Sequence, residues 1–285
     1  MKKILVATDL SSRSDRALDR TAHLAKSLDA EVHILHVIDE DLPSRLAQEV
    51  KKNSTELLEK QIANTEALKG LRTKVDVRFG HTWKTVVDAA NTEAADLIVL
   101  GTHRNRGLIE LFQGTTLDRV VRASRKPVLI AMGAVASEYK KVLVGVDFSG
   151  STIAIVETAA AISSQAPLLL VHAYHIPYKG LIMRTDAQGD ISQTEREQVE
   201  KPLADQLAQL IASLPKGLAK PTTIIREGGA TTVIETEART NHADLIVVGV
   251  HGRSGFAQAL LGSTARELLS NTPLDLLIVP PRDAE

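Results

Sequence analysis

A glycine-bearing segment in the last part of the chain has the residue types and spacing to bind a phosphate group. It runs from Gly249 through Gly252 to Gly262 and continues with Ser263 and Thr264, with two residues between the first pair of glycines and nine between the second. Glycine lets the backbone approach a ligand closely and adopt positive φ. Ser263 is predicted to be the N-cap of a helix. Because first-turn amides point outward from a helix and favour an anion, the segment predicts a phosphate site.

The first half of the chain carries a departure from this pattern. Its corresponding residues are Gly101, Arg104, Gly114, Thr115 and Thr116. At residue 104 an arginine Cβ stands where the backbone would approach a phosphate, and the side chain can disfavour the φ that glycine allows. Two interpretations are open: Arg104 and Arg106 fill the pocket in place of a ligand, or their guanidinium groups bind an anion in an altered geometry. We expect a lost or altered site in this half.

The two segments occupy corresponding places in a duplicated chain. Residues 2–11 reappear in similar form at 140–149, and residues 95–101 reappear at 243–249. The matches stay in order over nearly the whole chain. A period this long indicates duplicated domains rather than a solenoid.

Each copy alternates short apolar strands with helices. The expected strands are 4–8, 31–38, a strand ending at Gly80, 96–100 and a strand after Pro127 in the first copy, and 142–146, 167–174, a strand ending at Gly228, 244–248 and a strand after Pro273 in the second. Such alternation requires parallel strands with right-handed crossovers. The prediction is an α/β fold of two tandem Rossmann-like domains, each a five-stranded parallel sheet with helices on both faces. The boundary falls near 133–139, which predicts domains 1–136 and 137–285.

Ligands of such sheets bind beyond the carboxyl ends of the strands. Asp9 and Asp147 follow the first strand of each copy. We expect Asp147 to take part in a site, whereas Asp9 is equally explained as a cap of the following helix. Ser11 and Ser149 are interpreted as helix caps rather than nucleophiles.

The G-x₂-G-x₉-G-[S/T] pattern, the early aspartate and the strand that ends in His-Val or His-Ala resemble the universal stress protein family, over essentially the whole chain. The resemblance implies an adenine nucleotide alpha hydrolase-like fold that binds ATP, with or without magnesium, in the second copy. The residues implied to bind ATP are Asp147 and Gly249 for the ribose region, the backbone of Ala173 for adenine, and Gly252, Gly262, Ser263 and Thr264 for the phosphates. The degenerate counterpart comprises Asp9, Val37, Gly101, Arg104, Gly114, Thr115 and Thr116.

Composition narrows the class of protein. At 285 residues the chain has room for two ordinary domains, and 44% apolar residues are enough for packed cores. The net charge of −1 gives no global field that would favour nucleic acid or an anionic membrane. Cysteine is absent, which excludes disulfides and cysteine-ligated zinc. Since no stretch approaches the roughly twenty apolar residues of a membrane span, we expect a cytoplasmic protein.

The histidines do not form a recognisable metal-binding motif. His33, His36, His172 and His175 lie in or beside expected strands, but His36 and His172 end equivalent strands of different domains and need not converge. No His-x₃-His pair stands on an expected helix. We therefore interpret these histidines as structural and predict no metal site.

Three hypotheses for function remain open. The leading one is a regulatory or protective ATP-binding protein of the stress response with a protein partner of unknown identity; the others are a slow ATPase or autokinase and a nucleotide-independent assembly module. No convincing carboxylate pair flanks the glycine segment, which argues against efficient turnover. The apolar last strands at 128–132 and 274–279 are expected at sheet edges. We predict that they pair and form a pseudo-dimer within one chain, to which a homodimer could be added.

Overall fold

The computed structural model describes residues 1–11, 14–40, 44–102, 115–133, 135, 137–163, 166–176, 193–251 and 261–281. Of the residues singled out above, Arg104, Arg106, Gly114 and Gly252 lie outside these ranges. In the described part of the chain, no helix is both long enough and apolar enough to cross a membrane.

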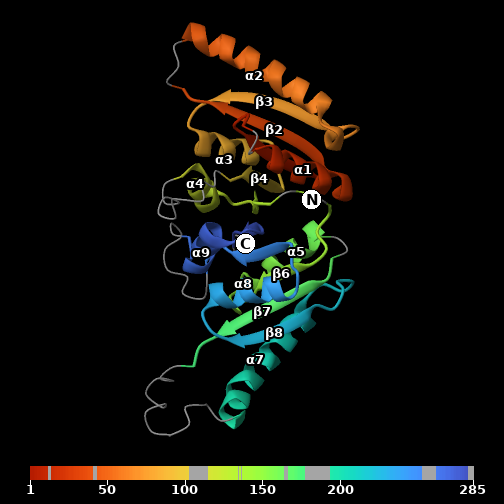
Figure 1. The fold of residues 1–285 in the computed structure, drawn as a ribbon, viewed down its shortest axis with the longest axis vertical. Helices are drawn as coiled ribbons and strands as arrows, with labels where there is room; N and C mark the ends of the chain where they lie inside the picture. The colour runs from red at the N-terminus through yellow and green to blue at the C-terminus, as the bar shows by residue number, and fades with distance from the viewer. Residues whose placement is uncertain are drawn as a thin grey trace.

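Ten strands form one continuous sheet, in the order β3-β2-β1-β4-β5-β10-β9-β6-β7-β8 (Figure 1). The strands are β1 (Lys3–Thr8), β2 (Glu31–Ile38), β3 (Thr73–Phe79), β4 (Leu97–Gly101), β5 (Val128–Ala131), β6 (Val142–Gly145), β7 (Leu168–Tyr174), β8 (Thr222–Glu227), β9 (Leu245–Gly249) and β10 (Asp275–Val279). All pairings within each half are parallel. The expected fold of two five-stranded α/β halves is confirmed.

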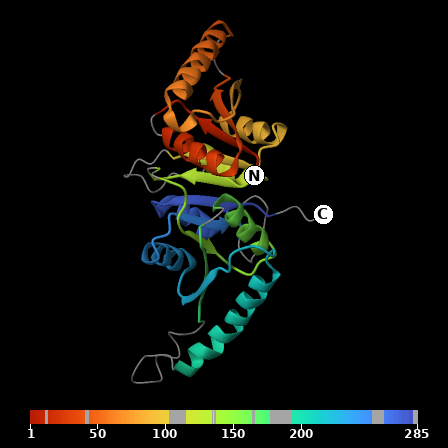
Figure 2. The ribbon, with the colours of Figure 1, turned by 90° about the vertical axis from the view of Figure 1, so that its right-hand side faces the viewer.

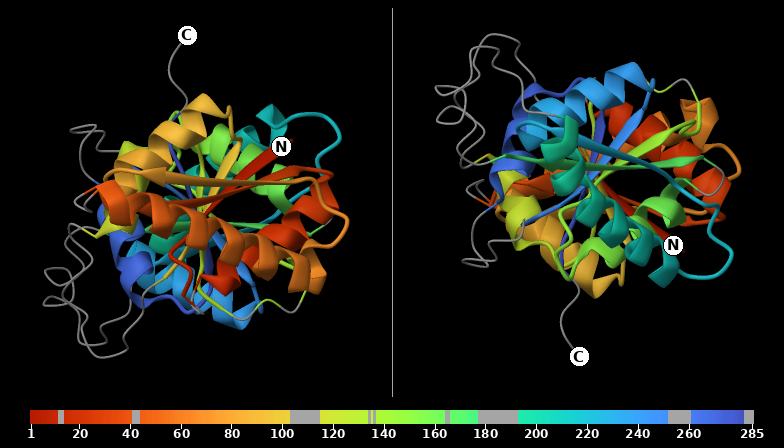
Figure 3. Two further views of the ribbon diagram at one scale, coloured as in Figure 1. Left: turned by 90° about the horizontal axis from the view of Figure 1, so that it is seen from above. Right: turned by 90° about the horizontal axis from the view of Figure 1, so that it is seen from below.

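Helices cover both faces of the sheet (Figures 2 and 3). They are α1 (Asp15–Leu28), α2 (Ser44–Asn64), α3 (Thr82–Thr92), α4 (Thr116–Ala123), α5 (Thr152–Ser163), α7 (Gln193–Ser213), α8 (Ala230–Thr240) and α9 (Ser263–Asn271), with a short 3₁₀ turn η1 (Glu66–Leu68) after α2. One buried cluster packs α1, α2, α5 and α7 against the sheet, and a second packs α3, α4, α8 and α9 against the opposite face. The strands are near-continuous apolar runs because both of their faces are buried.

The two halves meet through their last strands. β5 and β10 pair antiparallel, with Leu129 opposite Leu277 at the centre of the contact. The predicted pairing of the two apolar edges is therefore present. Each buried cluster also contains residues of both halves, so the core continues across the joint.

A buried polar network fastens one side of this joint. The Asp275 carboxylate accepts hydrogen bonds from Arg20 Nε (2.7 Å), the Tyr139 hydroxyl (2.8 Å) and the Met132 amide (2.8 Å). Arg20 also donates to the carbonyl of Ser137 and lies 4.2 Å from the centre of the Tyr139 ring. Residues of the first half, the connection and the second half are thus held together by one carboxylate.

Candidate functional site

The predicted second-half site lies at the carboxyl ends of β6 and β9. These two strands are neighbours, and the helices that follow them cover opposite faces of the sheet. A crevice at this reversal of strand order is where ligands of open α/β sheets bind. Asp147 follows β6, Gly249 ends β9, and Ala173 lies near the end of β7. The described residues of the predicted site therefore lie together at the carboxyl ends of the strands.

The carboxylate of Asp147 organises the turn after β6. Its Oδ1 accepts from the Ser149 amide (2.9 Å) and from Thr152 Oγ1 at the start of α5 (3.2 Å). Between them Phe148 has φ 58°, in the left-handed region that side chains other than glycine rarely adopt. The first copy repeats this turn: Leu10 has φ 61°, and Asp9 accepts from the residue two positions later. Strained backbone at one position in both copies is typical of a functional turn.

The interpretation of Ser11 and Ser149 as helix caps is wrong. Ser11 Oγ donates to Asp9 (2.6 Å), and the N-cap of α1 is Ser14. Ser149 Oγ is buried and has no hydrogen-bond partner. The Ser11 hydroxyl is engaged with Asp9 and the Ser149 hydroxyl has no partner, so neither caps the helix that follows.

The N-cap of the helix α9 differs from the predicted one. Gly262, not Ser263, is its N-cap, and the Gly262 amide donates to the carbonyl of Val250 (2.8 Å), which anchors the helix start beside β9. Gly262 provides no side-chain cap, and the first turn, which includes Ser263 and Thr264, contains no acidic residue. Because first-turn amides lack intrahelical acceptors, this helix start can receive an anion.

The corresponding helix α4 differs in its first turn. Thr115, its N-cap, accepts from the amide of Asp118 through its hydroxyl (3.3 Å), and the buried Asp118 carboxylate belongs to the same turn. Aligning Thr115 and Thr116 with Ser263 and Thr264 places Arg266 opposite Asp118. An acidic residue disfavours an anion at a helix N-terminus, whereas a basic one favours it. The sites predicted from the sequence did not include Asp118 or Arg266, although the alignment of the two helices shows the difference in charge between them.

Three buried polar atoms among the described residues of the second half have no hydrogen-bond partner. They are Ser149 Oγ after β6, His251 Nε2 after β9 and Arg266 Nε in the first turn of α9. Arg266 is held in place by a bond from Nη2 to the carbonyl of Leu261 (3.1 Å). Each unsatisfied buried polar group costs about 1–3 kcal/mol. Two potential donors and a hydroxyl beside a helix N-terminus are suited to the oxygen atoms of a polyanion.

Other predicted residues have structural explanations. A Cβ on Gly249 would lie 2.9 Å from Ile155 Cδ1 and 3.2 Å from the carbonyl oxygen of His251, so a larger residue there would crowd α5 and the segment after β9. The Nδ1 atoms of His36 and His172 lie 2.9 and 2.7 Å from carbonyls at the ends of β1 and β6, respectively. These contacts agree with the structural interpretation of both histidines. Val37 and Ala173 are half-buried near the ends of equivalent strands.

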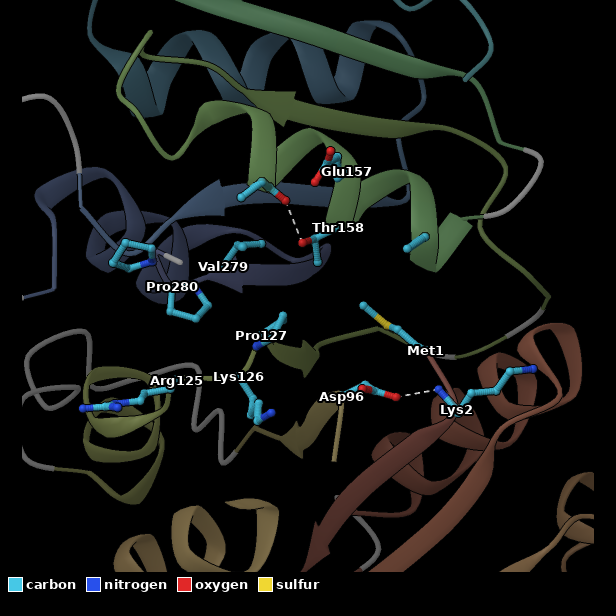
Figure 4. A pocket seen from close by; sticks show the side chains of 13 residues that line it. Met1, Lys2, Asp96, Arg125, Lys126, Pro127, Glu157, Thr158, Val279 and Pro280 are labelled. Carbon is cyan, nitrogen blue, oxygen red and sulfur yellow. Dashed lines mark hydrogen bonds between the residues drawn. The ribbon is translucent and has the colours of Figure 1, made fainter. Parts of the chain in front are cut away.

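A cavity of about 740 Å³ lies elsewhere, between the two halves (Figure 4). Its walls include Met1, Pro127, Thr158, Val279 and Pro280. None of the predicted site residues that the structure describes lines it. The correspondence that aligns residues 2–11 with 140–149 places Thr158 where α1 has Arg20 and Met1 where the connection has Tyr139. The cavity is therefore the pseudo-symmetric counterpart of the buried Asp275 network, left open by shorter side chains.

Comparisons with known proteins agree with this architecture. The model of the universal stress protein family matches residues 1–131 and 138–280. The chain is 26% identical to a universal stress protein of Mycolicibacterium smegmatis over 98% of this chain and 97% of the relative. It is 32% identical to universal stress protein YxiE of Bacillus subtilis over 45% of this chain and 97% of the relative. The crystal structure of a universal stress protein from Archaeoglobus fulgidus superposes with a TM-score of 0.71 at 18% identity, covering 98% of both chains, which is a likeness of fold.

Proposed function

The chain belongs to the universal stress protein family, and from this premise we propose that its second half binds ATP at the carboxyl ends of β6 and β9. The observation that supports the proposal most is the start of α9. It combines an uncapped first turn with Arg266, whose buried Nε has no hydrogen-bond partner, and Ser149 Oγ and His251 Nε2, after the neighbouring strands β6 and β9, are buried without partners as well. These features fit the phosphates of a nucleotide.

The proposed contacts are those that the family resemblance implies for this chain. Ser263 and Thr264 offer backbone amides to the phosphates, and the glycines 252 and 262 of the family pattern let the backbone approach them closely. Asp147 and Gly249 are assigned to the ribose, and the backbone of Ala173 to the adenine edge. ATP brings the negative charge that the helix start and Arg266 attract, and its magnesium ion would travel with the phosphates.

The first half is proposed to bind ATP weakly or not at all. Asp118 places a carboxylate in the first turn of α4, and the Thr115 hydroxyl already accepts one of the amides there. The first turn of α4 is therefore a second reason, besides the arginine at residue 104, to expect weak ATP binding in this half. The degenerate set Asp9, Val37, Gly101, Arg104, Gly114, Thr115 and Thr116 is accordingly proposed as a remnant of a site.

ATP binding would make the protein a regulator rather than an efficient enzyme. A ligand that binds the folded chain stabilises it by mass action, so occupancy of one half would report the nucleotide level. We propose a regulatory or protective role in the cytoplasmic stress response, domains divided between residues 136 and 137, and a homodimer as an optional further assembly.

Titration calorimetry with magnesium and ATP tests the proposal. We expect about one site per chain with micromolar affinity, near −8 kcal/mol. Arg266→Asp, which reproduces Asp118 of the first half, should weaken binding at least about thirtyfold, or ~2 kcal/mol, because it replaces a cation in the first turn of α9 by an anion. Arg239→Met is the matched control, since the exposed Arg239 lies in the last turn of α8, at the amino ends of the strands.

Two results would overturn this function. One is absence of ATP binding by the intact chain. The other is unchanged binding by Arg266→Asp and also by Gly252→Arg, because that pair of variants blocks both the helix start and the glycine pattern. Two equivalent sites per chain would contradict the degenerate first half while leaving the second-half site intact.

A further inference from the structure

A buried histidine in the first half has no hydrogen-bond partner. His33 of β2 is 1% exposed, and both of its ring nitrogens lack partners. An imidazole normally uses at least one nitrogen as donor or acceptor when it is buried. The sequence pattern predicts a structural role for His33, but a structural histidine should have a bond of the kind that His36 makes to Thr8. His33 therefore requires another explanation.

Two carboxylates face the unsatisfied ring. His33 Nε2 lies 3.4 Å from Oδ2 of Asp76, which stands on β3, the neighbouring edge strand. Glu93, the C-cap of α3, completes the group, and one potential ligand atom of each residue lies within 4.8 Å of the others. The side chains of Asp76 and Glu93 are 22% and 18% exposed, so the group opens to solvent on the carboxylate side.

The duplicated copy shows that the fold does not need this group. Because His36 and His172 hold equivalent positions, Leu169 of β7 corresponds to His33. The pairing of β7 with β8 then gives Ile224 the position in the second copy that Asp76 holds in the first. Asn241, the C-cap of α8, takes the place of Glu93. Two apolar side chains and an amide thus occupy these positions in the second copy, and the same fold forms without a buried imidazole.

Two basic side chains already neutralise the two carboxylates of the group. Lys74 contacts both oxygens of Glu93 (2.9 and 3.0 Å), and Arg78 contacts Asp76 (2.7 Å) and Glu93 (3.3 Å). The Lys74 side chain is 47% exposed and that of Arg78 is 28% exposed, so both can turn into solvent. One divalent cation carries the same charge as these two side chains together. The C-terminal end of α3 also favours a positive charge.

From this arrangement we infer that His33, Asp76 and Glu93 form a binding site for a divalent transition metal, with zinc as the best match. Zinc takes one imidazole and two carboxylates readily, and magnesium avoids imidazole. Two ligand atoms on a tetrahedral zinc with bonds of 2.0–2.1 Å are separated by roughly 3.3–3.4 Å. The separation between His33 Nε2 and Asp76 Oδ2 has this value. Water would complete the coordination, and Lys74 and Arg78 would be displaced.

The test is zinc binding to the full-length chain after treatment with a chelator, in the absence of nucleotide. Competition with a chromogenic chelator should show one site of micromolar or higher affinity, and cobalt should give visible absorption bands of a tetrahedral site. His33→Leu and Glu93→Asn, each of which introduces the residue found at that place in the second copy, should lower the affinity at least tenfold. Circular dichroism and thermal unfolding establish that each variant is folded.

His81→Gln is the matched control, because His81 forms an exposed pair with Glu40 (3.1 Å) on the same half. It should leave zinc binding unchanged. Lys74→Met should strengthen zinc binding severalfold, since it removes a competing cation from Glu93, whereas a structural ion-pair cluster predicts no such gain. Absence of zinc binding by the intact chain, or zinc binding that survives both His33→Leu and Glu93→Asn, would overturn the proposal.

Discussion

At the scale of single residues, buried polar atoms without hydrogen-bond partners mark side chains that the stability of the fold does not explain. Five such side-chain atoms occur among the described residues, and they belong to His33, Ser149, His251 and Arg266. Most buried polar groups in proteins have partners, so exceptions need an explanation. One of these atoms lies in the first turn of α9, two lie in the segments that follow β6 and β9, and the other two belong to one imidazole, so the two proposals rest on these places.

A residue-scale prediction concerns Tyr139. Burial raises the pKa of its hydroxyl well above the usual value of 10, the nearby Asp275 charge raises the pKa further, and Arg20 lowers it. A raised pKa in the folded state means that the stabilisation from protonated Tyr139 is fully present below about pH 10 and is lost as the pH rises through the folded-state pKa. Spectroscopic titration at the tyrosinate band should therefore show one of the three tyrosines failing to ionise until the protein unfolds.

The variant Tyr139→Phe identifies that tyrosine. It keeps the ring beneath Arg20 but removes the donor to Asp275, so we expect a loss of about 1.5–3 kcal/mol in the free energy of unfolding, as for a hydrogen bond to a charged group. The late-ionising tyrosine should vanish from the titration. Retention of that late step in the variant would mean that another tyrosine is responsible.

At the scale of elements, equivalent helices in the two halves carry different side chains on the same frame. α4 has Asp118 in its first turn and α9 has Arg266 there, while α1 presents Arg20 to the joint and α5 presents Thr158. Backbone positions are shared because the strand order and crossovers are the same. What each element contributes to a site therefore depends on a few side chains at its start or on one face.

The contact between α5 and β9 gives an element-scale prediction. Gly249→Ala should lower the free energy of unfolding by about 1–3 kcal/mol, because the new Cβ meets Ile155 Cδ1 and the His251 carbonyl. Ile155→Val removes the crowded methyl group and alone should cost about 0.5–1.5 kcal/mol. In urea unfolding the double variant should lose less than the sum of the two single losses. Strict additivity would show that α5 does not limit the residue at position 249.

At the scale of the whole molecule, the antiparallel pairing of β5 and β10 joins two sheets into one, with α2 and α7 at its far ends (Figure 1). The joint is asymmetric. One side is closed by Asp275, Arg20 and Tyr139, and the pseudo-symmetric side is the cavity of Figure 4. The connection between the halves passes on the closed side, which supplies Tyr139 and the carbonyl of Ser137 to the network.

The closed side yields a prediction for overall stability. Arg20→Met leaves the buried Asp275 carboxylate without its cation, and breaking a buried ion pair in this way costs about 3–5 kcal/mol. Chemical denaturation should show this loss, and hydrogen exchange should show weaker protection of β5 and β10. Lys26→Met, at an exposed position of the same helix, should change stability by no more than about 0.5 kcal/mol. Equal effects of the two variants would refute a role of the network in holding the halves together.

The sequence by itself determined the duplication, the α/β fold and the order of the elements. Residues 31–38 were expected to form a strand and do so as β2, because apolar runs bounded by polar residues are local signals. The pairing of the two last strands could also be predicted, since both are apolar edges. Family membership follows from patterns that recur in order along the whole chain.

Tertiary structure alone decided which distant side chains meet. Gly262 rather than Ser263 caps α9 because its amide bonds to Val250, a contact that local propensity does not contain. The meeting of His33 with Asp76 depends on the register of two neighbouring strands, in which a shift of one residue would turn the side chain to the other face. Arg20 reaches Asp275 only after both halves have folded and joined. Sequence patterns report periodicity along the chain, whereas these contacts arise from the packing of elements that are far apart in it.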